Sequence, residues 1–387
     1  RIMPRTERPT LGHRFQYATY RVVETVLRTF SVRSSFRTGA GLARLLFPFC
    51  GPLKRVVLRN LRFAFGDEKS DEEIKVLAKD IFQNTTGNLF CSVRLPFLTD
   101  QALRDSVTIE GLELLEQSVE EGKGTVFLVP HMGNWELLAQ LTLLADLPVE
   151  MGTHYRPLNN ALMNQLIERR RKQRGLHLFP KRTSSHTLSK FLRENGVLGI
   201  LADQRIPSRG DLCSFFGRPT TCSPLPALLA RRTGARLLGV HCTTVDDDHW
   251  KLTITPVDGT DSAACAANLE RAWHSSPADV FWFQDRWKLP RSHPLRGLTR
   301  PPGPAKSSIT KPIRLVALHA STEMPPERPD FPFPDHLLTW ETRECDHPEA
   351  ISRDDALTVD LFVTDAKLPV PCCPADKLLP ASEAETR

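Results

Sequence analysis

The chain has 387 residues, 40% of them hydrophobic and 25% charged, so it exceeds one average domain and can bury a large core. Nine cysteines without a Cys-x-x-Cys pair exclude a disulfide framework and indicate buried thiols in a reducing compartment. No run of about 18 apolar residues occurs, which excludes a clear membrane-spanning helix. Residues 301–387 hold 9 of the 51 basic and 15 of the 45 acidic side chains, so residues 1–300 carry a net charge of +12 and predict an anionic partner.

Residues 1–100 are predicted to form a basic, helical region. Residues 1–64 carry 13 basic and two acidic side chains, and arginines interrupt each apolar stretch, which is not typical of a secretory signal. Apolar residues recur at helical spacing at Tyr20, Val23, Leu27 and Phe30, and a second apolar segment spans 42–49. Two interpretations stay open: an amphipathic helix in a membrane interface, or a helix packed on the core. Further elements are expected before the central strand: helices at 71–79, 80–93 and 112–121, and a short strand and turn at 107–113.

The central stretch of the chain is TVFLVPHMGNWE, residues 125–136. Its first five residues have the pattern of a buried strand, Pro130 ends that strand, and a polar turn leads into an apolar helical pattern from Trp135. Gly133 allows a sharp turn, and Asn134 is a favourable N-cap. A turn between a strand and a helix lies at the carboxyl end of the strand, where open α/β sheets place their sites.

His131 in this turn and Glu136 in the following helix are the candidate catalytic residues. A carboxylate hydrogen-bonded to one ring nitrogen fixes the tautomer, and the other nitrogen can then accept a proton as a general base. Two other interpretations stay open: a histidine that caps the loop beside a solvated Glu136, and a pair of metal ligands. No further His, Asp or Glu nearby has ligand spacing, so neither a metal nor another cofactor is expected.

His-x4-Glu after an apolar strand resembles the signature of the glycerolipid-type acyltransferases. The fuller form, Pro-His-Met-Gly-Asn-Trp-Glu at 130–136, resembles the bacterial lipid A biosynthesis lauroyl/myristoyl acyltransferases. Further blocks follow in the family's order up to about residue 290, among them Tyr-Arg-Pro-Leu-Asn-Asn at 155–160 and Asp-Gln at 203–204. The resemblance implies an α/β fold in which helices flank a mixed central sheet, preceded by a helical, membrane-associating region.

Basic residues follow the next strand, which is predicted at 149–155. Arg156 at its end is a candidate for binding a phosphate or a developing oxyanion, with a surface ion pair as the alternative. Between residues 151 and 182 eight basic side chains accompany a single acidic one, Glu168, and most of them lie on a helix predicted at 161–174. An acidic acyl carrier protein or a phosphorylated lipid headgroup would satisfy this charge, and a solvated helix face stays open. No RNA-binding motif or helix-turn-helix pattern accompanies the cluster, so nucleic acid is not expected.

A buried strand predicted at 196–202 ends in Asp203 and Gln204, which are therefore expected at the same sheet edge as His131. Asp203 is interpreted as orienting Arg156 or an acceptor sugar, or as capping the following loop. A strand pair is also expected, at 236–244 and 250–256, with a turn at 246–248.

Three parts are predicted: a helical region at 1–100, an acyltransferase core at 101–295 and a proline-rich acidic tail at 296–387. Residues 301–387 hold 14 of the 31 prolines, and their low hydrophobic density favours disorder or loose packing. Short strands are expected within this tail at 314–318 and 357–363.

Residues and resemblance together predict an acyltransferase of lipid A biosynthesis. His131, oriented by Glu136, would take the proton of a hydroxyl on the lipid A precursor, and the freed oxygen would attack the thioester of an acyl carrier protein. Arg156 and backbone N–H groups near Asn134 would stabilise the oxyanion. The residues expected to bind substrate are Asn134, Arg156, Asp203 and Gln204.

The resemblance also implies a place and partners for the protein. It is expected at the cytoplasmic face of the bacterial inner membrane, peripheral or anchored by the N-terminal region. Expected partners are an acyl carrier protein, an anionic membrane surface and a phosphorylated glycolipid acceptor. Acyl transfer to another glycolipid or phospholipid is an alternative. A catalytically silent lipid-binding homologue is another, although it would not need His131 and Glu136 together.

Overall fold

The computed structural model describes residues 9–206, 210–287, 313–320, 338–345, 361–363 and 372–373. Contacts within the chain divide it into two units. The first unit comprises residues 1–58, 69–203 and 224–284, and the second comprises residues 59–68, 204–223 and 285–387.

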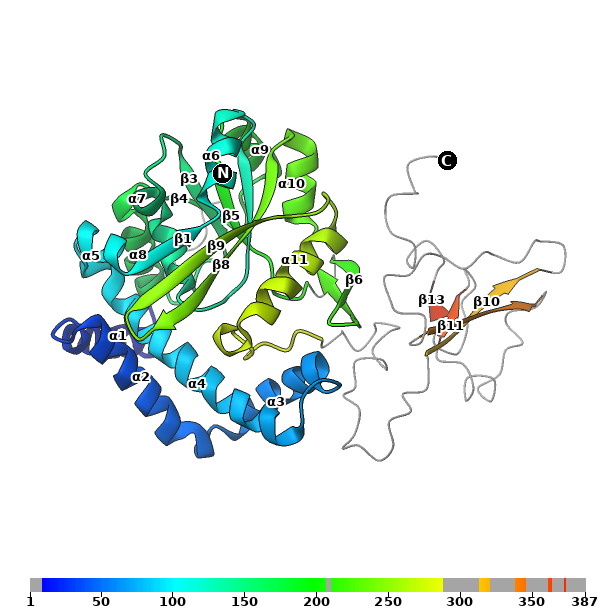
Figure 1. Ribbon diagram of the computed structural model, residues 1–387, viewed down its shortest axis with the longest axis horizontal. Helices are drawn as coiled ribbons and strands as arrows, with labels where there is room; N and C mark the ends of the chain where they lie inside the picture. Colours follow the sequence, from blue (N-terminus) through cyan, green and yellow to red (C-terminus); the bar gives the residue numbers. More distant parts are fainter. Residues whose placement is uncertain are drawn as a thin grey trace. The chain divides into compact units, whose positions relative to one another are not determined.

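A seven-stranded sheet lies at the centre of the first unit (Figure 1). Its strand order is β1-β9-β8-β2-β5-β3-β4; β8, β2, β5, β3 and β4 run in one direction, and β9 and β1 run in the other. The strands are β1 (Val107–Glu110), β2 (Thr125–Val129), β3 (Met151–Tyr155), β4 (His177–Pro180), β5 (Val197–Leu201), β8 (Arg236–Asp246) and β9 (His249–Pro256). This mixed, mostly parallel sheet confirms the predicted fold class. Because the central strands are parallel, the turns that follow β2, β3 and β5 meet at one edge.

Strand β2 lies between β5 and β8, and all five of its residues are buried. A strand covered on both faces has an uninterrupted apolar run, as this one does. Its one hydroxyl, on Thr125, is satisfied by Ser118 of α6, at 2.7 Å between the two oxygens. The apolar run therefore anchors the sheet and fixes the start of the turn that carries His131.

Helices cover both faces of the sheet (Figure 1). The helices α9, α10 and α11 contact β5, β2 and β8 on one face, whereas η3 and α7 pack over the opposite face. The α-helices are α1 (Leu11–Leu27), α2 (Val32–Leu46), α3 (Gly51–Phe65), α4 (Asp71–Arg94), α5 (Asp100–Asp105), α6 (Leu112–Glu120), α7 (Leu141–Ala145), α8 (Ala161–Arg171), α9 (Ser185–Arg193), α10 (Leu225–Thr233) and α11 (Ser262–Ser275). The 3-10 helices are η1 (Phe47–Phe49), η2 (Leu95–Phe97), η3 (Trp135–Gln140), η4 (Lys172–Arg174) and η5 (Pro277–Asp279).

The two helical segments predicted at 71–79 and 80–93 are one helix, α4. It begins with a capping box in which Ser70 and Glu73 satisfy each other's backbone N–H groups. Its buried Asn88 accepts a hydrogen bond from the Trp250 indole at 2.7 Å and donates one to Thr244 at 3.0 Å. These bonds fix α4 against the β8–β9 pair.

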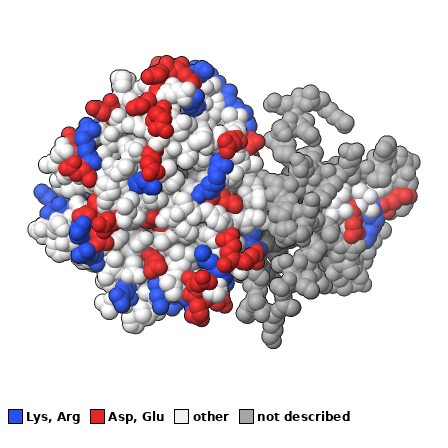
Figure 2. Space-filling model, viewed as in Figure 1, with Lys and Arg blue, Asp and Glu red and all other residues white. Residues whose placement is uncertain are grey.

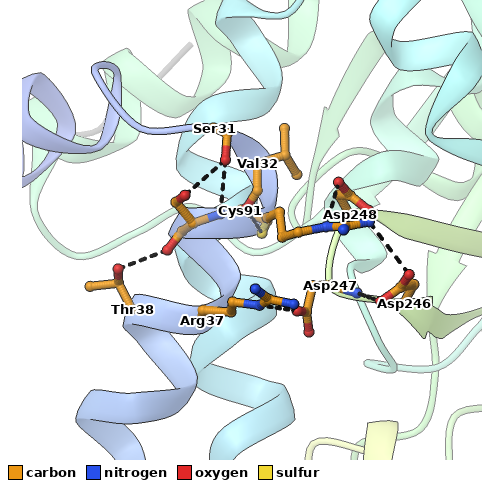
Figure 3. A network of polar contacts seen from close by, with 10 residues as sticks. Ser31, Val32, Arg37, Thr38, Cys91, Asp246, Asp247 and Asp248 are labelled. Atoms are coloured by element: carbon orange, nitrogen blue, oxygen red, sulfur yellow. Dashed lines mark hydrogen bonds and ion pairs between the residues drawn. The ribbon is translucent and has the colours of Figure 1, made fainter.

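The turn between β8 and β9, predicted at 246–248, holds helix α2 in place (Figure 3). Arg33 donates to both carboxylate oxygens of Asp248, at 3.0 and 3.1 Å, and Arg37 donates to Asp247 at 2.5 Å. Exposed ion pairs contribute only about 0–1 kcal/mol each, so they orient α2 more than they stabilise the fold. Two of the cations counted in the basic N-terminal region are thus paired within the protein.

Helix α1 contacts both α4 and α8. Its buried Glu24 forms ion pairs with Arg170 of α8 and with Arg21. Of the predicted stripe, Leu27 is buried, Tyr20 and Phe30 are half-buried, and Val23 is 38% exposed, so the core-packed interpretation holds for part of the stripe. The exposed apolar side chains of α1 are Leu11, Phe15, Val22, Val23 and Val26.

The second apolar segment of the N-terminal region is also exposed. Its exposed side chains are Leu42, Leu45 and Leu46 of α2, Phe49 of η1 and, one turn into α3, Leu53. Within the part of the chain that the structure describes, no helix has the length and apolar character needed to cross a bilayer. Membrane association of the N-terminal region stays a prediction.

The second unit contains two small sheets in its described segments. One is the hairpin of β6 (Asp211–Phe215) and β7 (Arg218–Cys222), and the other has the strand order β11-β10-β12-β13 with parallel pairing throughout. Its strands are β10 (Ile313–His319), β11 (Leu338–Glu344), β12 (Leu361–Val363) and β13 (Cys372–Cys373). Strands β10 and β12 confirm the two predicted in the tail. The rest of the predicted loose tail lies outside the described residues, and the three-part division stays a prediction.

Candidate active site

His131 and Asp203 form a hydrogen-bonded pair at the carboxyl edge of the sheet. His131 follows β2 and Asp203 follows β5, and the two strands pair in parallel with register maintained to their last residues. The imidazole Nδ1 lies 2.7 Å from Asp203 Oδ1, and the backbone N–H of His131 donates to Asp203 Oδ2, also at 2.7 Å. The Asp203 side chain is 4% exposed and that of His131 is 16% exposed. The predicted position of Asp203 at this edge is confirmed, and its partner is His131.

The pKa of His131 is raised above its ordinary value. Burial lowers this pKa, but the charge of Asp203 and the hydrogen bond to Asp203 together raise it by more, and Glu136 adds to the rise. An aspartate acceptor at Nδ1 keeps a proton on that nitrogen, so Nε2 is the nitrogen that takes up a further proton. This arrangement suits a general base.

The turn after β2 depends on glycine at position 133. Gly133 has a φ of 54°, and a Cβ there would lie 2.5 Å from the carbonyl oxygen of Cys242. The segment from Asp279 to Phe281 runs alongside: Gly133 donates to the Asp279 carbonyl at 2.8 Å, and Phe281 donates to the His131 carbonyl at 2.9 Å. The turn is therefore held from both sides.

The predicted helix start at Asn134 is wrong in two respects. Residues 135–140 form the 3-10 helix η3, and the Asn134 side chain makes no cap hydrogen bond. Asn134 is 2% exposed, and its amide oxygen and nitrogen have no partner among the described residues. The neighbouring backbone N–H groups of His131 and Gly133 are bound by Asp203 and Asp279, and an oxyanion role for the N–H groups near Asn134 stays a prediction. A tight 3-10 turn pinned by the 279–281 segment leaves no α-helical N-terminus here.

Glu136 has a different partner from the one predicted. Asp203 takes the expected place at His131 Nδ1, whereas Glu136 accepts two hydrogen bonds from Arg171, from Nε at 3.1 Å and from a terminal nitrogen at 2.5 Å. The two side chains are 26% and 21% exposed, so this bidentate pair is largely removed from water. Bidentate pairs between arginine and a carboxylate are among the stronger hydrogen-bonded contacts, which accounts for Glu136 being held by Arg171. A catalytic role for Glu136 stays a prediction.

The arginine cluster of α8 is directed inward more than a solvated helix face would be. Arg170 binds Glu24 and the Tyr20 hydroxyl, Arg171 binds Glu136, and Arg174 binds Gln140 and Asp100. These partners lie on α1, η3 and α5, so Arg170 and Arg171 of α8, with Arg174 of the adjoining η4, connect this segment to each of them. Sequence reasoning missed Arg171 because its carboxylate lies 35 residues away in the chain.

Arg156 and Gln204, the remaining predicted substrate-binding residues, are both exposed. Arg156 directly follows β3, at the same edge of the sheet as His131. Gln204 follows Asp203 in the chain and belongs to the second unit. Binding of substrate by either residue stays a prediction.

An apolar cavity of about 60 Å³ lies between the sheet and η3. Trp135, whose ring centroid is 5.4 Å from that of His131, lines this cavity, and Glu136 and Arg171 are its charged lining residues. The sheet supplies the opposite wall. The sheet residues lining the cavity are Phe127, Val129, Met151, Gly152, Thr153, Val197, Gly199, Leu201 and Val240.

The described residues contain no cluster of three or more His, Cys, Asp or Glu side chains placed to hold a metal ion. On the face shown in Figure 2, basic and acidic side chains are interspersed over the described residues. The chemistry that the arrangement at His131 can perform is proton transfer beside an apolar cavity.

Comparison with known proteins places these features in a family. The family model described as bacterial lipid A biosynthesis acyltransferase matches residues 10–289. The phosphatidylinositol mannoside acyltransferase of Mycobacterium tuberculosis is 27% identical over 311 residues, which cover 77% of this chain and 95% of that protein. Lipid A biosynthesis acyltransferase 2 of Shigella flexneri is 23% identical over 215 residues, covering 54% of this chain and 66% of that protein. The chain therefore belongs to the bacterial lipid A biosynthesis acyltransferase family.

Proposed function

We propose that the protein is an O-acyltransferase that moves a fatty acyl chain from a thioester to a hydroxyl of a phosphorylated membrane glycolipid. The observation that carries this proposal is the His131–Asp203 pair beside an apolar cavity. The pair supplies a base for a hydroxyl nucleophile, and the cavity accepts a hydrocarbon chain.

The reaction proceeds without an acyl-enzyme intermediate. His131 Nε2 takes the proton of the acceptor hydroxyl as its oxygen attacks the thioester carbonyl. The new C–O bond forms, the C–S bond breaks, and the proton passes from the imidazolium to the departing thiolate. Asp203 stabilises the imidazolium through the 2.7 Å bond at Nδ1.

Glu136 and Arg171 act as positioning residues in this scheme. Their bidentate ion pair fixes η3 against α8 at the wall of the cavity, beside Trp135. Arg156, at the same sheet edge, binds the phosphate of the acceptor or the oxyanion. Its exposure and its place after β3 support contact with a charged group arriving from solvent.

The acceptor is proposed to be a mannosylated phospholipid, with a lipid A precursor as the second candidate. Of the two kinds of relative, the mannoside acyltransferase is the more similar and matches over nearly its full length, which supports this order. The donor is proposed to be an acyl carrier protein. The positive charge of residues 1–300 supports an acidic donor.

A direct assay tests the proposal. The purified full chain is incubated with acyl thioesters of carrier protein or coenzyme A, and with phosphatidylinositol mannoside or lipid A precursor in mixed micelles; acylated product is measured by mass spectrometry. We expect transfer by the wild type and a loss of at least about a hundredfold in His131→Ala, because general base catalysis contributes about 10²–10⁴-fold.

A matched control is His154→Ala, which removes a histidine near the same sheet edge that has no part in the proposed reaction. Its turnover should remain close to that of the wild type. Wild-type turnover in His131→Ala, with both variants folded, would contradict the assignment of the base. Transfer to one acceptor alone identifies the glycolipid class.

The protein is also proposed to attach to the cytoplasmic face of the inner membrane through its N-terminal helices. The exposed apolar residues of α1, α2 and η1, among many basic residues, support insertion into an anionic interface. Such attachment would bring the cavity to a lipid acceptor.

A further inference from the structure

Gly199 lies in the middle of β5, on the face of the strand that lines the cavity. Side chains alternate along a strand, and Val197, Gly199 and Leu201 line the cavity while Leu198 and Ile200 face the opposite side. Leu198 and Ile200 are buried, whereas Gly199 is partly exposed. A glycine inside a central strand weakens that strand, and it often marks a place where another backbone segment or a ligand approaches closely.

The neighbouring backbone leaves room for a side chain at Gly199. A Cβ on Gly199 would meet its nearest atoms at 3.7–3.9 Å, on Gly152, Thr153 and Val129, which is ordinary van der Waals distance. Gly152, also at the cavity, differs: a Cβ there would lie 2.7 Å from the Phe179 ring. The protein would therefore tolerate a side chain at 199 but not easily at 152.

What a side chain at position 199 would change is the cavity itself. Gly199 stands opposite Phe127 on β2 and Thr153 on β3, and both of these residues also line the cavity. A side chain at 199 would rise between them into the space under η3. Because the cavity measures only about 60 Å³, even one added methyl group removes a substantial part of it.

We propose that Gly199 is a specificity-determining residue, which sets the length of the acyl chain that the cavity accepts. This inference rests on the proposed function, because it takes the cavity as the site of the acyl chain. The absent side chain leaves room for the end of a longer chain, and any larger residue shortens the chain that fits.

The test compares Gly199→Ala and Gly199→Val with the wild type on a series of saturated acyl donors from octanoyl to palmitoyl. We expect the preferred acyl-chain length to be shorter in Gly199→Ala than in the wild type, and shorter again in Gly199→Val. Turnover of the shortest donors should be retained while that of the longest falls about tenfold or more, the discrimination that one methylene provides in an apolar pocket. Ile200→Val is the control, since it changes volume on the opposite face of β5 and should leave the preferred length unchanged.

A binding measurement separates this inference from the proposed function. Displacement of a fluorescent fatty acid by fatty acids of increasing length is measured in the His131→Ala background, with and without Gly199→Val. A shift of the tightest-binding length to shorter acids supports the role of Gly199 even where the wild type transfers no acyl chain. An unchanged length optimum in folded Gly199→Val, in either measurement, overturns it.

Discussion

Asp203 bonds both the ring and the backbone of His131, so one buried carboxylate fixes the tautomer of the base and the position of its main chain. Hydrogen bonds to a charged acceptor contribute about 1.5–3 kcal/mol, more than those between neutral groups. Glu136 also raises the pKa of this imidazole through its charge, and its own oxygens accept hydrogen bonds from Arg171. The two carboxylates therefore have different effects on the pKa of His131.

This difference predicts the pH dependence of transfer. A base must be neutral to act, so activity should rise with pH through the raised pKa of His131. Asp203→Asn removes the charge that raises this pKa, so the acid limb should move to lower pH while kcat falls about a hundredfold or more. The measurement is kcat/KM against pH for wild type and variant.

Glu136→Gln is the matched comparison, since it also removes one negative charge. Glu136 raises the pKa of His131 less than Asp203 does, so the acid limb should move less. An acid limb that stays in place in Asp203→Asn would show that the limb belongs to another group.

Sequence reasoning located His131 and Asp203 correctly at strand ends, because an apolar run that ends at a polar residue can be recognised in the sequence itself. It could not pair them, since β2 and β5 become neighbours only through the order of strands in the sheet. The 3-10 form of η3 was likewise invisible, because its apolar spacing is compatible with an α-helix. Arg171 was seen only as one cation among several.

The hairpin β6–β7 is built around a buried cation. Arg286 is 2% exposed; it donates to the Thr221 carbonyl at 2.9 Å and to Cys222 Sγ at 3.1 Å, and its guanidinium lies over the Phe215 ring. Its hydrogen bonds among the described residues include no carboxylate. A buried guanidinium is stabilised by a nearby anion, and Cys222, to which Arg286 donates, is a partner that can ionise.

The pKa of Cys222 is accordingly lowered below its ordinary value. The hydrogen bond from Cys213 lowers it most, the charge and hydrogen bond of Arg286 add to this, and burial and the charge of Asp211 act in the opposite direction. Because the pKa is below the value of about 8.5 for an unfolded cysteine, the thiolate stabilises the fold fully above that value. This contribution is lost as the pH falls through the lowered pKa.

Cys222→Ser therefore should destabilise the protein in a pH-dependent way. Under reducing conditions the free energy of unfolding should fall by about 2 kcal/mol at pH values above about 8.5 and by much less at acid pH, because serine supplies no anion. Urea titrations at both ends of the range measure this. Cys91→Ser is the control, since burial raises the pKa of Cys91 to about 12 and its loss should not depend on pH in this range. Equal losses at both pH values in Cys222→Ser would contradict a thiolate.

This hairpin shows why some elements are not visible in sequence. Its turn residues, Phe216 and Gly217, both have positive φ, at 52° and 63°. Two-residue turns of this kind favour Asn-Gly, and phenylalanine at the first position conceals the signal. The long apolar strands and the amphipathic helices, by contrast, can be predicted because their hydrophobic residues recur at regular spacing along the sequence.

At the scale of the whole molecule, charge and exposed apolar surface are concentrated near the N-terminus. Phe49 is 81% exposed and Leu45 is 69% exposed, and both lie among the 13 basic residues of positions 1–64. Single exposed apolar residues are common, but several on consecutive helices mark an interaction surface. Their apolar area and positive charge suit an anionic bilayer.

Leu45→Glu and Phe49→Glu should each weaken binding to phosphatidylglycerol vesicles by about thirtyfold, because burying one large apolar side chain contributes about 2 kcal/mol. Vesicle flotation of the full chain measures this, with phosphatidylcholine vesicles as the neutral comparison. Val245→Glu, at an apolar residue near the end of β8 that is 60% exposed, is the control and should bind as the wild type does. Unchanged flotation of both N-terminal variants would contradict the prediction that these helices contact the membrane.

The backbone hydrogen bonds between residues 279–281 and the turn after β2 affect when this turn can fold during synthesis. His131 and Gly133 receive their backbone partners from residues that leave the ribosome about 150 positions later. Domains form from the N-terminus as they are synthesised, so β2 and its neighbours can assemble before this turn is fixed. The turn that carries His131 thus acquires its final shape late in synthesis, when the sheet around it already exists.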